Sequence, residues 1–342
     1  MKTTAIPVFQ LASRPSLSVR LADFVTLMKP RVMALAVFTA LVGMMIAPVR
    51  LEPLLGSVAI LAISAGAGAA GVLNMWYDAD IDAVMTRTAR RPIPLGAISR
   101  SEALAFGLVL AAGAVAVLCL VINVKAAALL AFTILFYVVV YTAWLKRSTP
   151  QNIVVGGAAG ALPPMIGWAA ATGEIGLEPI LLFLIIFLWT PPHFWALALT
   201  RADEYARAGV PMLPVVAGRS ATTKHIFIYS VLLLPVSLLP WAVGFTGGIY
   251  GAVATVCGTI FIALAAQLRR SGGVNEFAAH RLFAFSILYL FLLFAALLSS
   301  NANRSPVTVS ARAEAFGLSQ AALVADDFRT THGPSAARAG EV

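Results

Sequence analysis

The chain has 342 residues, of which 60% are hydrophobic and only 11% are charged, and its mean hydropathy is +0.89. A soluble domain carries about 25% charged residues, so this composition excludes an ordinary water-soluble domain and favours the bilayer as solvent. The formal net charge of +9 does not indicate a nucleic-acid partner, because the basic residues lie in short loops between apolar segments, where they set topology and meet membrane lipid headgroups.

Nine apolar segments, each long enough to cross a membrane, follow one another along the chain. They are approximately residues 32–49, 53–77, 103–122, 126–145, 152–172, 179–200, 225–245, 248–267 and 282–300. Backbone groups in lipid must satisfy one another, and the alternation typical of barrel strands is absent, so the segments are predicted to be helices. The predicted fold class is all-α and integral to the membrane, with nine transmembrane helices in residues 31–300 between a cytoplasmic N-terminal segment (1–30) and a poorly ordered C-terminal tail (301–342).

Basic residues concentrate in the N-terminal segment and in the loops after the second, fourth, sixth and eighth segments. The loops of the opposite set hold only Arg50 and Lys125. The positive-inside rule therefore predicts a multi-pass protein of the bacterial inner (plasma) membrane, with the N-terminus and the basic loops in the cytoplasm and the C-terminus outside.

The second segment ends in a polar constellation. Asn74, Asp78 and Asp82 are spaced four residues apart, so they project from one face if the helix continues. Two carboxylates one turn apart repel each other unless a cation lies between them, and Mg²⁺ prefers one or two carboxylates together with phosphate oxygens. Arg87 and Arg91 follow, and guanidinium groups bind phosphate directly. The pattern predicts metal ligands at Asn74, Asp78 and Asp82, of which the two aspartates are also catalytic. A lipid-tailed diphosphate is predicted to bind at Asn74, Arg87 and Arg91.

The loop after the fourth segment supplies Lys146 and Arg147 on the same side of the membrane. They are predicted to help bind the diphosphate, with Lys146 also assigned a catalytic part; ordinary topological charge is an equally weighted alternative at this loop.

The sixth segment contains Pro191 and Pro192 followed by His193. The prolines are expected to break or kink the helix and to free carbonyl groups. An ionisable residue within a membrane segment is a functional candidate, so His193 is a candidate acceptor-binding residue; a structural histidine bonded to a freed carbonyl is the alternative.

A second acidic loop begins at Asp203, which is followed by Glu204 and Tyr205. Asp203 is predicted as a catalytic residue and metal ligand and Tyr205 as an acceptor-binding residue. A role in orienting the first loop and a solvated surface are the alternatives.

The Asn-x3-Asp-x3-Asp motif with Arg87-Thr88-x-x-Arg91-Pro92 resembles the UbiA superfamily of intramembrane prenyltransferases. The segments 191–198 and 203–215, with 281–287, resemble the branch of that superfamily that farnesylates protohaem. The likeness covers residues 21–298. In one respect the chain departs from the superfamily, since Leu199 and Arg207 stand four residues before and after Asp203 where a second acidic pair would need a carboxylate.

This resemblance implies farnesyl diphosphate and haem B as substrates, haem O and diphosphate as products, Mg²⁺ as cofactor, and a haem A synthase as a partner that takes the product. The nearest alternative is a prenyltransferase of the same superfamily acting on an aromatic ring such as 4-hydroxybenzoate. A membrane transporter is the alternative from another class, but it predicts ionisable residues near mid-membrane, whereas these charges lie at one face.

Overall fold

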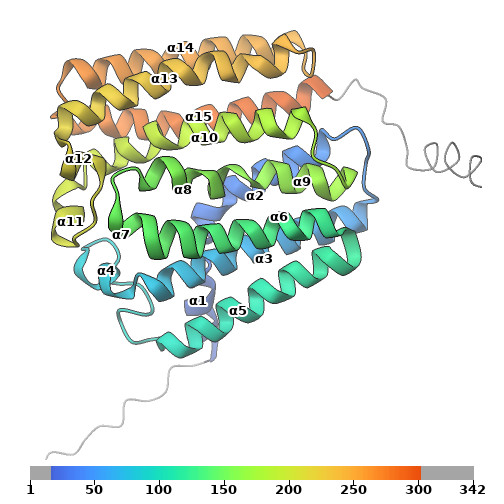
Figure 1. The fold of residues 1–342 in the computed structure, drawn as a ribbon, viewed down its shortest axis with the longest axis horizontal. Helices are drawn as coiled ribbons and strands as arrows, with labels where there is room; N and C mark the ends of the chain where they lie inside the picture. Colours follow the sequence, from blue (N-terminus) through green and yellow to red (C-terminus); the bar gives the residue numbers. More distant parts are fainter. Residues whose placement is uncertain (1–16, 302–342) are drawn as a thin grey trace, which may run out of the picture.

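The computed structural model describes residues 17–301, and within that range the regular secondary structure is entirely helical (Figure 1). The elements are α1 (Leu17–Leu27), α2 (Pro30–Met45), α3 (Pro53–Tyr77), α4 (Ala79–Val84), α5 (Arg100–Val117), η1 (Leu118–Ile122), α6 (Val124–Leu135), η2 (Phe136–Leu145), α7 (Lys146–Ser148), α8 (Asn152–Ala161), α9 (Pro163–Thr172), α10 (Leu177–Leu199), α11 (Ala202–Arg207), α12 (Leu213–Val216), α13 (Gly218–Ala242), α14 (Gly248–Arg270) and α15 (Glu276–Asn301). The two η elements are π-helical stretches that continue α5 and α6.

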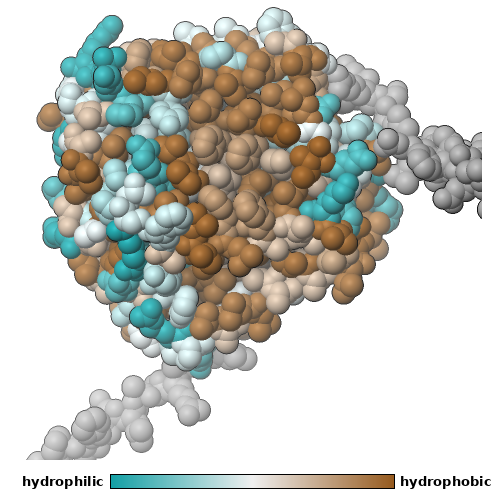
Figure 2. Space-filling view, viewed as in Figure 1, coloured by the Kyte–Doolittle hydropathy of each residue, from teal (hydrophilic) through white to brown (hydrophobic). Residues whose placement is uncertain are grey.

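The predicted nine-helix membrane bundle is confirmed. Among the described residues, eight helical runs are long and apolar enough to cross a membrane, and the bent pair α1–α2 makes the ninth. Hydrophobic residues form a broad band across the middle of the bundle, and hydrophilic residues gather at its ends (Figure 2). The end formed by the short helices α4, α7, α11 and α12 carries the predicted site loops (Figure 1).

The described part of the predicted N-terminal segment is largely helical, because it contains α1. The axis of α1 meets that of α2 at 55°, and the break between the two helices contains Lys29. Residues 1–16 and 302–342, which include nearly all of the predicted C-terminal tail, lie outside the described residues.

Helices α2 and α9 pack backbone to backbone at the centre of the bundle. A Cβ atom added to Gly167 of α9 would stand 1.9 Å from the carbonyl oxygen of Ala40, and one added to Gly43 of α2 would stand 2.2 Å from that of Pro164. Small residues permit this close approach, and the resulting van der Waals contacts stabilise the packing of helices in lipid. The contact holds α2 in the middle of the fold, beside the site.

Pro191 and Pro192 do not break their helix, because α10 is continuous from Leu177 to Leu199. The prolines remove two backbone donors but leave the helical dihedrals in place. The helix packs against α8, α13 and α15, and this packing supports it through the proline turn.

Candidate functional site

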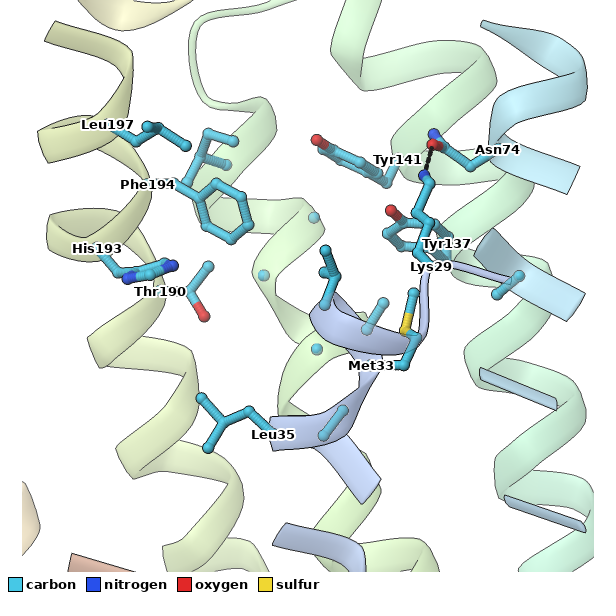
Figure 3. A pocket seen from close by; sticks show the side chains of 18 of the residues that line it. Lys29, Met33, Leu35, Asn74, Tyr137, Tyr141, Thr190, His193, Phe194 and Leu197 are labelled. Atoms are coloured by element: carbon cyan, nitrogen blue, oxygen red, sulfur yellow. Dashed lines mark hydrogen bonds between the residues drawn. The ribbon is translucent and has the colours of Figure 1, made fainter. Parts of the chain in front are cut away.

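One cavity of about 520 Å³ opens between α2, α10 and the helices α3 and η2 (Figure 3). Its polar end is lined by basic, acidic and amide side chains from five different elements or loops. These are Lys29, Asn74, Asp82, Arg87, Arg91 and Lys146. The remaining wall is largely apolar and aromatic, with Tyr137, Tyr141, Phe194 and Phe283 among its residues. The cavity therefore suits a molecule with a charged head and an apolar body.

Asn74, Asp78 and Asp82 share one helix face, as predicted. Although α3 ends at Tyr77, the backbone ladder continues: the N–H of Asp78 donates to the carbonyl of Asn74 (2.9 Å), and that of Asp82 donates to the carbonyl of Asp78 (2.8 Å). All three side chains are buried. The Asn74 amide Nδ2 donates to Asp78 Oδ2 (2.8 Å) and to Thr142 Oγ1 (2.9 Å), so its oxygen is turned away from both.

A different cation pairs with each member of this row. Lys29 Nζ donates to Asn74 Oδ1 (2.6 Å), Lys146 Nζ to Asp78 Oδ2 (2.5 Å), and Arg91 Nη1 to Asp82 Oδ2 (2.6 Å). The Lys146 and Arg91 side chains are only 15% and 20% exposed. Interactions of this kind are stronger than those at the open surface, because solvent screens them less.

Arg147 is not among the residues that line the cavity. Its guanidinium donates twice to Asp80, at 2.8 Å each, and lies 4.9 Å from the centre of the Tyr77 ring. The hydrogen bonds from Arg147 lower the pKa of Asp80 to about 2. This pair holds α7 to the start of α4, and Arg147 Nη2 also lies 3.6 Å from Asp78 Oδ1. The diphosphate role of Arg147 stays a prediction.

The second acidic loop contributes Tyr205 to the cavity lining, while Asp203 is exposed. Glu204 pairs with Arg201 (2.7 Å), and this hydrogen bond lowers the pKa of Glu204, with Arg87 of the first loop as a further contributor. Burial raises the pKa of the Tyr205 hydroxyl. The metal role of Asp203 and the orienting role of this loop both stay predictions.

The donor set at Asp78 fits Mg²⁺. Asp78 Oδ1 is buried without a hydrogen-bond partner, although Arg147 Nη2 lies 3.6 Å away. Within residues 17–301, no three His, Cys, Asp or Glu side chains are grouped to hold a metal ion by themselves. Mg²⁺ commonly binds through one or two carboxylates and completes its shell with substrate phosphate oxygens and water. Asp78, Asp82 and the amide oxygen of Asn74 are suited to that mode.

His193 lies in the cavity wall at a distance from this polar cluster (Figure 3). Its ring is stacked between Trp189 and Phe283, with centroid distances of 4.3 and 4.7 Å. Its Nδ1 is 2.6 Å from Ser286 Oγ, and the Ser286 hydroxyl donates to the carbonyl of Phe283 (2.6 Å). The direction of the His193–Ser286 bond depends on the imidazole tautomer, and when the Ser286 hydroxyl donates to the Phe283 carbonyl, Nδ1 carries the ring proton and donates it to Oγ. Nε2 then bears a lone pair, the state in which histidine binds metals.

The acceptor-binding role of His193 stays a prediction, and the geometry shows how its ring is held. Its partner is a side chain of α15 and not a carbonyl freed by the prolines. The histidine is therefore oriented by its neighbours, with one nitrogen left for a ligand.

Sequence reasoning missed Lys29, Thr142 and Ser286. Lys29 reads as ordinary positive-inside charge, and Thr142 reads as part of an apolar span. Ser286 lies 93 positions from His193 in the chain, so only the tertiary fold brings them together. The Lys29-Pro30 dipeptide at the start of a span was the one available signal, since proline at a helix start fixes where the preceding side chain stands.

Comparison with known proteins gives a consistent result. Residues 36–287 match the model of the UbiA prenyltransferase family. The protein named protoheme IX farnesyltransferase from Azorhizobium caulinodans is 62% identical over 279 residues, which cover 81% of this chain and 91% of that protein. Protoheme IX farnesyltransferase 1 from Mesorhizobium japonicum is 59% identical over 291 residues, covering 85% of this chain and 94% of the relative.

Solved structures share the fold at low sequence identity. A structure of digeranylgeranylglyceryl phosphate synthase has a TM-score of 0.70 at 20% identity and covers 84% of this chain and 100% of its own. A UbiA homologue from Archaeoglobus fulgidus, bound to GPP and Mg²⁺, has a TM-score of 0.59 at 16% identity, with 81% and 99% covered.

Proposed function

The chain belongs to the UbiA prenyltransferase family, and we propose that it transfers the farnesyl group of farnesyl diphosphate to a vinyl group of haem B, giving haem O and diphosphate. The observation that carries this proposal is the division of one cavity into a cation-rich end, at Lys146 and Arg91, and an aromatic end with an oriented histidine. A prenyl diphosphate needs the first end, and an iron porphyrin suits the second.

The polar end binds and activates the diphosphate. Asp78, Asp82 and the amide oxygen of Asn74 would hold Mg²⁺, which would supply positive charge to offset the negative charge of the leaving group. Lys146, Arg91 and Arg87 present donors to the remaining diphosphate oxygens. They stabilise the charge that develops as the bond between the farnesyl carbon and the diphosphate oxygen breaks.

The apolar part of the cavity holds the farnesyl chain and keeps bulk water from the developing carbocation. The electron pair of the haem vinyl group forms the new carbon–carbon bond. The cationic centre left beside the ring takes the oxygen of one water molecule, and that water loses a proton. The reaction therefore converts farnesyl diphosphate, haem B and water into haem O, diphosphate and a proton.

His193 and Tyr205 are assigned to the acceptor. His193 Nε2 is available as an axial ligand for the haem iron, and the stacked rings of Trp189 and Phe283 hold the imidazole in place. Tyr205 lies in the cavity lining on the side of the second acidic loop. A porphyrin held through its iron at His193 would occupy the aromatic end of the cavity.

The active-site loops are assigned to the cytoplasmic side of a bacterial inner membrane. The argument is the distribution of Lys and Arg in the sequence, which concentrate in the loops at the end of the bundle that carries α4, α7 and α11. The N-terminus then lies in the cytoplasm and the C-terminus outside. A haem A synthase in the same membrane would receive the product.

The decisive experiment is an acceptor screen. Purified protein in lipid nanodiscs is incubated with Mg²⁺ and farnesyl diphosphate, together with haem B or 4-hydroxybenzoate, and products are identified by mass. Hydroxyethylfarnesyl porphyrin from haem B supports the proposal. Prenylation of 4-hydroxybenzoate alone would assign the chain to the aromatic-acceptor branch, and release of diphosphate with neither product would overturn transfer to both acceptors.

A further inference from the structure

Lys29 stands out from the rest of the described chain by its backbone. Its φ of 54° and ψ of 51° place it in the left-handed region, and among residues 17–301 no other residue except glycine has a positive φ. Side chains with a Cβ atom are strained there, and such strain persists only where the surrounding structure enforces it. The strain here directs one lysine side chain into the cavity.

The side chain that this backbone presents contacts a predicted metal ligand. Lys29 lies in the 55° break between α1 and α2, lines the cavity and donates to Asn74 Oδ1 (Figure 3). Asn74 cannot rotate its amide away without losing the bonds from Nδ2 to Asp78 and Thr142. The ammonium is therefore held on the oxygen that would otherwise face a metal ion.

The same relation holds at the other two members of the row, since Lys146 pairs with Asp78 and Arg91 pairs with Asp82. Three ligand oxygens thus each carry one cation. A lysine ammonium has three donors, and Lys29 uses one of them in its bond to Asn74. A cation placed this way is ready to transfer to a diphosphate oxygen when a metal ion takes the amide oxygen.

We propose that Lys29 is a fourth diphosphate-binding cation, beside Lys146, Arg91 and Arg87, held on Asn74 until Mg²⁺ and a prenyl diphosphate enter together. This inference rests on the proposed function for the identity of the anion. It makes binding of metal and anion mutually dependent: the metal ion alone must displace the ammonium from Asn74, whereas the metal with diphosphate gives that ammonium a new acceptor.

The test measures binding and not turnover. Isothermal titration of purified protein with Mg²⁺ alone, and with Mg²⁺ and inorganic pyrophosphate, is compared between wild type and Lys29→Gln. We expect Mg²⁺-pyrophosphate to bind about 10- to 100-fold more weakly to Lys29→Gln, the loss typical of one charged hydrogen bond, while Mg²⁺ alone binds at least as tightly as to wild type. A purely structural role would weaken both.

Two further variants guard the interpretation. Lys29→Gly removes the charge but favours the left-handed backbone, so it answers the question if the glutamine variant does not fold. Arg90→Gln removes an exposed cation of the neighbouring loop and should bind like wild type. Equal binding of Mg²⁺-pyrophosphate by wild type and either Lys29 variant overturns the assignment of Lys29, whereas no binding by wild type contradicts the proposed function itself.

Discussion

A substitution at Asp78 tests the proposed chemistry most directly. The side chain is 1% exposed and accepts hydrogen bonds from Lys146 (2.5 Å) and Asn74 (2.8 Å). Asp78→Asn keeps the shape but removes the charge, so Lys146 loses a charge-assisted bond worth about 1.5–3 kcal/mol. We expect the free energy of unfolding to fall by about that amount, which a membrane bundle of this size should tolerate.

Turnover should suffer more than stability. The variant loses a metal ligand and also leaves the Lys146 ammonium without its anionic partner, and removal of one preorganised electrostatic group typically lowers kcat by about 100- to 1,000-fold. The assay is haem O formation from haem B and farnesyl diphosphate under saturating Mg²⁺, with thermal unfolding in detergent measured on the same preparation.

Asp80→Asn is the matched control, because the same substitution is made two residues away at a carboxylate that is 58% exposed and pairs with Arg147. It should keep its activity within a few-fold. Turnover of Asp78→Asn within threefold of wild type, in protein that unfolds as predicted, would refute the assignment of Asp78 to the metal and leaving group.

Further predictions concern three other positions. Arg147 lowers the pKa of Asp80 from 3.8 to about 2, so this pair stabilises the fold above about pH 4 and the stabilisation disappears as the pH falls through 2. The unfolding temperature of wild type should therefore fall more between pH 4 and pH 2 than that of Asp80→Asn. Ser286→Ala removes the acceptor of the His193 Nδ1 proton, so we expect the KM for haem to rise about tenfold with the KM for farnesyl diphosphate unchanged, and the visible spectrum of bound haem to shift; an unaltered spectrum would contradict iron ligation by Nε2. Gly167→Ala forces a methyl group against a backbone carbonyl of α2 and should cost about 1–3 kcal/mol in thermal unfolding, whereas Gly113→Ala, which enters open space, should not; equal unfolding of the two variants would contradict the close packing.

Much of this site could be predicted from the sequence because it is local. Asn74, Asp78 and Asp82 lie on one continuous helical ladder, so their spacing alone predicts a shared face. Hydropathy likewise predicts the nine spans, since lipid leaves few alternatives to the helix.

What could not be predicted depends on contacts between distant segments. Arg147 and Lys146 are adjacent basic residues of one loop, so the sequence does not distinguish them. In the fold, Arg147 binds Asp80, whereas Lys146 lines the cavity. Lys29 enters the cavity because α1 and α2 are bent against each other, and Ser286 orients His193 because α15 packs on α10. Charge and hydropathy patterns carry no information on such pairings.

The second acidic loop bears on how many metal ions the site binds. Asp203 is exposed, Glu204 pairs with Arg201, and Arg207 stands where the superfamily pattern has an acid, so this loop adds no free carboxylate to the cavity lining. At the polar end, two carboxylates, Asp78 and Asp82, therefore face three paired cations, with Arg87 also in the lining. The chain itself thus carries a surplus of positive charge, where a site built on two metal ions would need more anionic ligands. We therefore expect calorimetry with Mg²⁺ and pyrophosphate to give one metal ion per protein, because the side-chain cations supply the charge that a second ion would provide.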